Sequence, residues 1–321
     1  MKWFASIVSL IAVVSASPLE KRAGVNDVAT VGYAGMNGGT TGGSGGTVTT
    51  VTTLAALQSA VAGDAKKIVI ISGTITGNTA VRVGSNTSVL GAKGSQLNGV
   101  GFGVAGVKNV IIRNVKVSKV LASAGDAIGV QSSSQVWIDH VDLSSDRDHD
   151  KLLMRYESYD GLLDITHAVT GITVSNSKLS NHAKGSLVGA ADTNTEDVAM
   201  TVTYVGNYFT NIGSGPLPSD SCLHCSGHGH IYNNYYENCS DGINTRVGAQ
   251  LLVENNVWTA PKKPLYSTSG GFAVARGNDF GGGTNTAPAG GFDTAPYQYS
   301  LLATGSVKSS VTANAGQTLT F

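Results

Sequence analysis

The chain has little charge and little sulfur for its length. Charged residues make up 13% of its 321 residues, 21 basic side chains balance 21 acidic ones, and there are four Met and three Cys. A net charge near zero gives no argument for a nucleic-acid or membrane-surface partner, because both attract an excess of positive charge. We therefore expect neither partner, and we expect function to depend on local charge.

Long apolar runs are absent beyond the N-terminus. The apolar stretch from Phe4 to Val14 follows a basic start and precedes small residues, which is the form of a secretory signal peptide. Its length of about eleven residues disfavours a membrane anchor, which needs about twenty. The dibasic pair Lys21-Arg22 resembles a processing site. We predict a signal peptide at 1–17, a propeptide at 18–22, one domain at 23–321 and an extracellular, secreted protein.

Cysteine is scarce and odd in number. Cys222, Cys225 and Cys239 lie in one short region, and an odd count leaves at least one thiol unpaired in an oxidising compartment. The glycosylation motifs that begin at Asn86 and Asn238 fit secretion, although such motifs are weak signals by themselves.

What the chain does contain is glycine, with 42 residues, beside many Val, Thr, Ser and Asn. Branched side chains suit pleated strands, and Gly and Asn suit tight turns. We therefore predict a strand-and-turn protein with little helix. The main exception is the segment from Ala55 to Ala62, which we expect to be a short helix that caps the N-terminal end.

A short pattern recurs in the middle of the chain: two apolar residues at alternate positions, then Asn or His, then turn residues. The terminal positions are 22 to 36 residues apart, which is near the length of one solenoid coil. They are Asn114, His140, Asn176, Asn207, Asn233 and Asn255. Such short strands bury their apolar faces only by stacking on the next coil, and stacked Asn side chains can hydrogen-bond along the stack. A β-sandwich competes, but it needs more uniform strands joined by hairpins. The predicted inward positions are Val110, Ile112, Val136, Ile138, Ile172, Val174, Leu251 and Val253.

Several ordered motifs carry a family resemblance that covers almost the whole mature chain. They are Gly125-Asp126-Ala127-Ile128, Val136-Trp137-Ile138-Asp139-His140, Asp160-Gly161-Leu162-Leu163-Asp164, His182-Ala183-Lys184-Gly185-Ser186 and Ser240-Asp241-Gly242-Ile243-Asn244-Thr245-Arg246. Together they resemble fungal pectate lyases of polysaccharide lyase family one. The resemblance implies an all-β, right-handed parallel β-helix, which we place at about residues 45 to 290.

The resemblance also implies calcium-dependent β-elimination on polygalacturonate, the de-esterified pectin of plant cell walls. A base removes the C5 proton, the oxygen on C4 leaves, and an unsaturated uronate remains. Because that proton is only weakly acidic, a metal that neutralises the adjacent carboxylate stabilises the developing charge. We expect Ca²⁺ as cofactor, the polysaccharide as partner and a monomeric protein.

Five residues match functional positions of the family. Asp126, Asp160 and Asp164 match its calcium ligands, and calcium prefers several such oxygen ligands. Lys184 matches a lysine that binds a substrate carboxylate, and Arg246 matches an arginine at the cleft. Each could instead be an ordinary turn or surface residue. We interpret Asp139 and His140 as structural, since His140 occupies a position that holds Asn in neighbouring coils.

The chain departs from the family where two arginines are expected, the first of which is the proposed catalytic base. Ungapped alignment from Asn207 places Gly215 and Asp220 at those positions, so the family's catalytic arginine is absent. The stretch from Leu152 to Ser158 is an insertion, and its Arg155 is a remote candidate for the base. An incorrect gene model would explain both stretches.

Alternative functions remain open at this point. A pectin lyase cleaves methyl-esterified chains without calcium, and its neutral substrate removes the need for three carboxylates. A polygalacturonase shares the fold but hydrolyses with paired acids, and its motifs are not found. From a different class, a catalytically impaired protein would hold galacturonan without turning it over.

Overall fold

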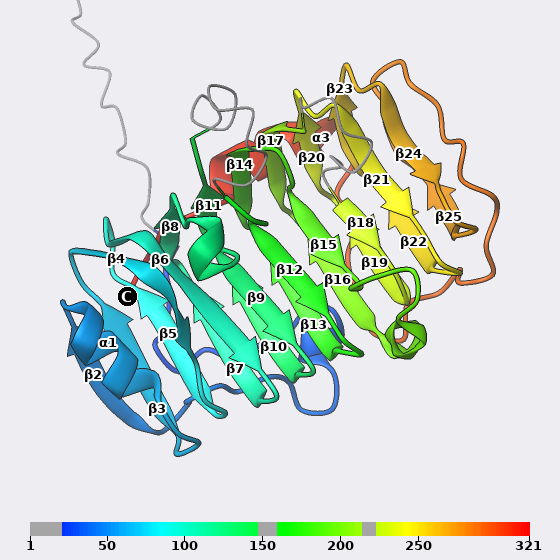
Figure 1. Ribbon diagram of the computed structural model, residues 1–321. Helices are drawn as coiled ribbons and strands as arrows, with labels where there is room; N and C mark the ends of the chain where they lie inside the picture. Colours follow the sequence, from blue (N-terminus) through cyan, green and yellow to red (C-terminus); the bar gives the residue numbers. More distant parts are fainter. Residues whose placement is uncertain (1–20, 147–158, 214–222) are drawn as a thin grey trace, which may run out of the picture.

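Short strands wind the chain into a stack of coils in the computed structural model, which describes residues 21–146, 159–213 and 223–321 (Figure 1). Every named strand pair is parallel, and successive strands of one sheet come from successive coils. This is a right-handed parallel β-helix, as predicted, and it excludes a sandwich built from hairpins. No helix within the described ranges is long and apolar enough to cross a membrane.

One side of the coil is a sheet of ten strands that runs from one end of the stack to the other. In spatial order these are β2 (Thr47–Val51), β3 (Lys67–Ile71), β5 (Thr87–Gly91), β7 (Lys108–Arg113), β10 (Ser134–Asp139), β13 (Thr170–Ser175), β16 (Thr201–Val205), β19 (His228–Tyr232), β22 (Gln250–Glu254) and β25 (Phe272–Arg276).

The remaining sides form one sheet of fourteen strands, because the long strand β6 (Gln96–Ala105) pairs with β8 (Lys116–Ser118) in one half and with β9 (Ile128–Gln131) in the other. The similarly long β4 (Thr74–Arg82) pairs with β6. The first half holds β8, β11 (Asp142–Ser144), β14 (Lys178–His182), β17 (Tyr208–Ile212), β20 (Tyr235–Glu237) and β23 (Val257–Thr259). The second half, called the site face below, holds β9, β12 (Leu163–Thr166), β15 (Ser186–Val188), β18 (Leu223–Cys225), β21 (Asp241–Thr245) and β24 (Lys263–Ser267).

Apolar side chains from all sides fill the inside of the coil. Val136 pairs with Val110 on one side and with Ile172 on the other, so equivalent positions stack coil upon coil. All eight positions predicted to face inward are fully buried in one continuous core. In the later coils Phe209, Tyr236 and Trp258 stack with ring centroids 4.8 and 4.7 Å apart. The repeat in the sequence therefore gave the register of the strands correctly.

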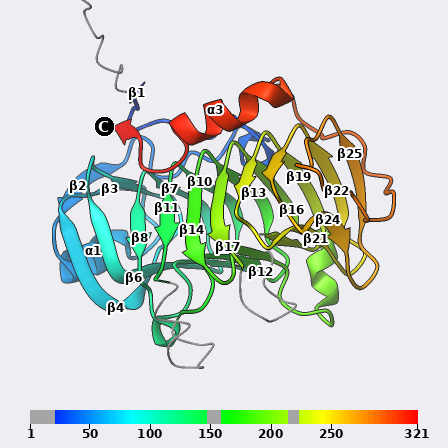
Figure 2. The same ribbon diagram turned by 90° about the horizontal axis from the view of Figure 1, so that it is seen from above.

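Helices cover an end and a side of the stack. The predicted cap is α1 (Leu54–Val61), which buries Leu57 and Val61 completely in the main core. The side chain of Thr53 caps its N-terminus by accepting the backbone N–H of Ala56. Figure 2 shows α3 (Thr304–Asn314) lying along the outside of the coil, where Val307 and Val311 pack on Tyr235 and Val257. The short 3₁₀ helices are η1 (Tyr33–Gly35), η2 (Ala122–Ala124) and η3 (Thr195–Ala199).

The dibasic pair forms a short strand beside the C-terminus. Lys21 and Arg22 make up β1 (Lys21–Arg22), which pairs in parallel with β26 (Leu319–Thr320). The backbone N–H of Ala23 donates to Thr320 O at 2.9 Å, so the residue after the predicted processing site also joins this contact. The signal peptide predicted at 1–17 lies outside the described residues.

A ladder of asparagines, buried except at Asn278, holds the later coils in register. Asn207 is a position that the repeat indicated, whereas Asn234 and Asn256 lie one residue beyond the indicated positions. Asn207 donates its backbone N–H to Asn234 Oδ1 at 2.9 Å, Asn234 does the same to Asn256 at 3.0 Å, and Asn256 to Asn278 at 2.9 Å. The predicted Asn176, Asn233 and Asn255 instead take positive φ angles of 46° to 55° at the turn. Asparagine tolerates that left-handed conformation better than most residues.

Replacing Asn234 by alanine is expected to lower the free energy of unfolding by about 3 kcal/mol, since several buried partners lose their hydrogen bonds at once. The Asn234 amide donates to Tyr204 O and Tyr232 O and accepts from Asn207. Urea denaturation would measure the change. Asn211→Gly, which removes exposed side-chain bonds and keeps a positive φ accessible, is the control. Equal losses in both variants would contradict the role of the buried ladder.

Candidate active site

Four of the five predicted site residues lie where neighbouring strands of the site face begin. Asp126 precedes β9 by two residues, Asp160 precedes β12 by three, and Lys184 precedes β15 by two, while Asp164 is the second residue of β12. β12 pairs with β9 on one side and with β15 on the other. Parallel neighbours lie about 5 Å apart, so residues at equivalent strand ends lie close together.

Asp126 and Asp164 converge on Gly161, in the turn before β12. The Gly161 N–H donates to Asp126 Oδ1 at 2.9 Å. A Cβ placed on Gly161 would overlap Asp164 Oδ1 and would lie 3.0 Å from Asp126 Oδ1. The two carboxylate oxygens therefore face the same small space, which a glycine leaves open.

Asp160 completes the acidic group but points its charge at the lysine. Lys184 Nζ lies 3.6 Å from Asp160 Oδ1, and both side chains are about half exposed, at 50% and 48%. A pair so open to solvent contributes little to stability. Lys184 therefore lies at the solvent-exposed edge of the acidic group, and its positive charge stays accessible to solvent.

Burial and neighbouring carboxylates raise the pKa of two of the aspartates, Asp126 and Asp164. Burial, and then the charge of Asp160, raise the pKa of Asp126 to about 6, although the Gly161 hydrogen bond opposes this. Burial and the charges of Asp126 and Asp160 also raise the pKa of Asp164 well above its usual range, with Lys184 acting in the opposite direction. Such mutual repulsion is relieved by a bound cation.

The donor set fits calcium better than a softer metal, since it consists of carboxylate oxygens, it is open to one side, and a glycine leaves room between two of the oxygens. Within residues 21–146, 159–213 and 223–321, however, no group of three or more His, Cys, Asp or Glu side chains is gathered closely enough to hold a metal ion as it stands. The third carboxylate, that of Asp160, is paired with Lys184 instead.

Arg246 lies apart from this acidic group. It follows β21, and through Leu187 and His224 the strand register places its neighbour Asn244 three strands beyond Asp164. Its guanidinium forms an ion pair with Asp192, and its buried Nε has no hydrogen-bond partner among the residues that the structure describes. The structure brings Lys184 to the aspartates and holds Arg246 further along the face.

Asp139 and His140 belong to a buried network on the ten-stranded sheet, in agreement with the structural interpretation. Asp139 Oδ2 lies 2.7 Å from Arg113 Nε and 2.7 Å from His140 Nδ1, and Ser175 Oγ donates to Asp139 Oδ1 at 2.7 Å. Burial alone would raise the pKa of Asp139, but His140, Arg113 and Ser175 hold it at about 2. Neither residue reaches the site face.

Two sequence-based hypotheses cannot be placed on the fold. Gly215 and Asp220, at the positions of the family's arginines, lie outside the described residues, as does Arg155 of the insertion.

Of the three cysteines, Cys239 is buried and disulfide-bonded. Since the chain has three cysteines, one thiol has no partner within it.

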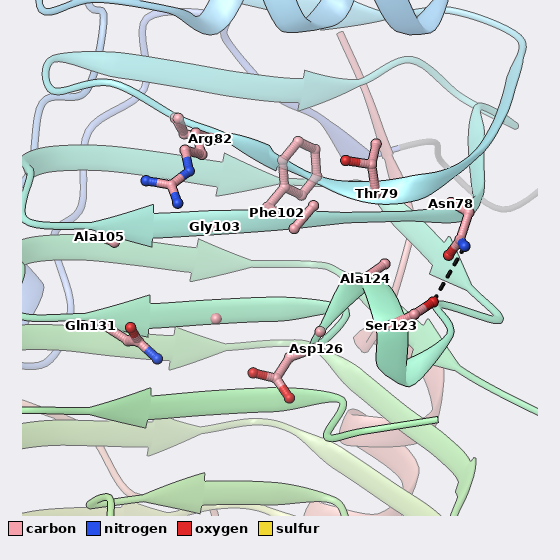
Figure 3. A pocket seen from close by; sticks show the side chains of 14 residues that line it. Asn78, Thr79, Arg82, Phe102, Gly103, Ala105, Ser123, Ala124, Asp126 and Gln131 are labelled. Atoms are coloured by element: carbon pink, nitrogen blue, oxygen red, sulfur yellow. Dashed lines mark hydrogen bonds between the residues drawn. The ribbon is translucent and has the colours of Figure 1, made fainter. Parts of the chain in front are cut away.

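Beside Asp126 the face is hollowed by a cavity of about 420 Å³ that the sequence did not indicate (Figure 3). Its lining includes Arg82, Phe102, Gln131 and Asp126, from β4, β6, β9 and the turn before β9. No motif marks the residues from Asn78 to Arg82, so only the folded register could reveal them.

In the absence of calcium, burial of Asp126 is expected to make stability fall as pH rises. Its pKa is 3.8 in an unfolded chain and about 6 in the folded one, so its stabilising contribution is complete below 3.8 and is lost as pH rises through about 6. Asp126→Asn should therefore weaken the fall in melting temperature across this range. Thermal melts in chelator measure it, with exposed Asp293→Asn as the control. An unchanged pH profile in Asp126→Asn would contradict the assignment.

Comparison with known proteins gives a consistent result. A family model described as pectate lyase matches residues 5–319. The "Probable pectate lyase A" of Aspergillus flavus is 55% identical over 307 residues, covering 94% of this chain and 92% of the relative. The pectate lyase A of Aspergillus niger is 52% identical over 94% of this chain and 91% of its own. A crystal structure of a pectate lyase from Bacillus sp. N165 in complex with trigalacturonate aligns at a TM-score of 0.75 and 30% identity, covering 90% of this chain and 98% of that one.

Proposed function

The chain belongs to the pectate lyase family, and from this premise we propose that it cleaves de-esterified galacturonan by β-elimination with a calcium ion held by Asp126, Asp160 and Asp164. The observation that carries the proposal is the group of mutually repelling carboxylates that faces Lys184 on adjacent strands of the site face. Bound calcium would supply the positive charge that neutralises the substrate carboxylate beside the carbon that loses its proton.

The chain's own groups orient the substrate for this reaction. The half-exposed ammonium of Lys184 can exchange its contact with Asp160 for a substrate carboxylate, because the present contact is 3.6 Å long and exposed to solvent. The aspartates stay ionised under the influence of a cation, and the Gly161 N–H fixes the carboxylate of Asp126. We assign to Arg246 a second contact with the polysaccharide, further along the same face.

Elimination also needs a group that accepts the C5 proton. As that C–H bond breaks, its electron pair forms the double bond between C4 and C5, and the bond from C4 to the glycosidic oxygen breaks. Glycine at position 215 has no side chain to accept the proton. Among the described residues Lys184 is the cation next to the acidic group, and it is therefore the first candidate for the base.

The alternatives are not favoured. The two Aspergillus relatives and the Bacillus structure described above are all named pectate lyases. A pectin lyase acts on neutral, esterified chains and would have no need of three carboxylates beside a lysine. We further propose that the protein is secreted, because its N-terminus has the form of a signal peptide, and that it is monomeric, as the family resemblance implies. The exposed position of Asn238 is compatible with a glycan there.

Product analysis on two substrates tests the proposal. With polygalacturonate we expect ultraviolet absorbance from the unsaturated product to rise together with the number of new chain ends, and with fully methyl-esterified pectin we expect neither. New ends without absorbance would indicate hydrolysis. Activity confined to the esterified polymer would indicate a pectin lyase, and bound polymer without new ends would indicate a binding protein.

A further inference from the structure

The cavity beside Asp126 extends the site face toward the N-terminal coils. It lies over β4, β6 and β9, with η2 at one edge, and holds a volume of about 420 Å³. Figure 3 shows Arg82 and Gln131 at one end of the cavity and the hydrogen-bonded pair Asn78 and Ser123 at the other. Because Asp126 is part of the wall, the cavity is continuous with the acidic group.

The strand register explains why this part of the face is hollow. Arg82 pairs with Gly103, Gly103 with Gly129, and Gly129 with Asp164, so these four residues form one straight row across four strands. Two consecutive glycines in the row leave a floor without side chains. A Cβ on Gly103 would meet nothing within 4 Å. The row runs along the axis of the coil for roughly 14 Å between Arg82 and Asp164, given three strand spacings.

The side chains around this floor suit a sugar acid. Arg82 is exposed, and among the described residues it has neither a carboxylate partner nor a hydrogen bond. Guanidinium groups bind carboxylates through paired hydrogen bonds. The amides of Gln131 and Asn78 offer donors and acceptors for hydroxyl groups. Phe102, which also lines the cavity, is almost fully buried.

We propose that this cavity is a distal subsite that binds a galacturonate unit of the same polysaccharide chain, with the carboxylate of that unit on Arg82. The inference rests on the proposed function, since it takes the acidic group as the place of cleavage. The polymer then lies along the coil axis, over the two glycines, and the enzyme gains affinity for chains that are long enough to occupy both places. Arg82 acts here as a specificity-determining residue, remote from the reacting atoms.

The test compares Arg82→Ala and Gly103→Leu with the wild type on trigalacturonate and hexagalacturonate. Loss of the Arg82 contact is expected to lower kcat/KM on hexagalacturonate about tenfold, the effect of one charge-assisted contact, and to leave the trimer almost unaffected. Gly103→Leu keeps the charge but fills the floor, so it should give the same length-dependent loss. Lys66→Ala removes an exposed positive charge at a corner outside the cavity and serves as the control.

Equal kinetics of wild type and both variants on the hexamer would overturn the subsite, and so would an equal loss on both lengths, which would indicate a general structural effect. If the wild type releases no unsaturated product, the proposed function fails first. Calorimetric binding of hexagalacturonate then decides the subsite separately. A tenfold weaker affinity in both variants, and not in Lys66→Ala, supports it, and unchanged affinity overturns it.

Discussion

Asp164→Ala is expected to lower kcat/KM on polygalacturonate by at least about a hundredfold, the usual effect of removing one preorganised electrostatic group. Asp164 is the deepest of the three aspartates, and its pKa is raised by burial and by both neighbouring carboxylates. Replacing it removes a proposed calcium ligand and also relieves the repulsion on Asp126. The variant should therefore bind calcium much more weakly and yet melt at a higher temperature than the wild type in chelator.

Calcium titrations followed by thermal melting measure both effects at once. Asp293→Ala, which removes an exposed aspartate of the C-terminal segment, should leave activity and calcium response unchanged. If Asp164→Ala retained the calcium-induced rise in melting temperature, the ligand assignment would be wrong whatever its activity.

Lys184→Ala is expected to produce a similar loss in kcat/KM, about a hundredfold, but with the opposite effect on the metal. The lysine opposes the rise in pKa of both Asp126 and Asp164, so its positive charge also competes with a cation. Its removal makes the acidic group more negative, and calcium affinity should increase.

This combination separates a role on the substrate from a role in folding. A variant that folds poorly would lose activity and calcium affinity together, whereas the account predicts that one falls and the other rises. Isothermal titration with Ca²⁺ and initial rates on polygalacturonate are the two measurements, with exposed Lys262→Ala as the control. Weaker calcium binding in Lys184→Ala would show that the lysine supports the site structurally.

The sequence predicted the coil well because stacking makes its signal repetitive. The pattern alone predicts that Val110, Val136 and Ile172 are equivalent positions, and they are direct register partners in the ten-stranded sheet. The pattern of inward-facing apolar residues recurs in every coil whatever the length of the loops, since each coil must stack its apolar side chains on those of the next. The grouping of Asp126, Asp160 and Lys184 at one edge follows from the same alignment of strand starts.

Features that depend on exact turn geometry could not be predicted in this way. Asn207 of the asparagine ladder was expected, but Asn234 and Asn256 lie one residue later than the pattern predicts, because the turn first needs a positive φ at Asn233 and at Asn255. The row from Arg82 to Asp164 depends on a bulge between Thr76 and Thr79 and on unequal loops between coils. Arg246 forms an ion pair with Asp192, a partner that no sequence motif indicated.

The central claim is that calcium on the site face makes the elimination possible, and one time course tests it most directly. Ultraviolet absorbance is followed during cleavage of polygalacturonate by protein from a verified gene, first in chelator, then after excess Ca²⁺, with Mg²⁺ in a parallel sample. The account predicts no product in chelator, full activity after Ca²⁺ and little with Mg²⁺, which demands a smaller and more regular set of ligands. Undiminished formation of unsaturated product in chelator would contradict it.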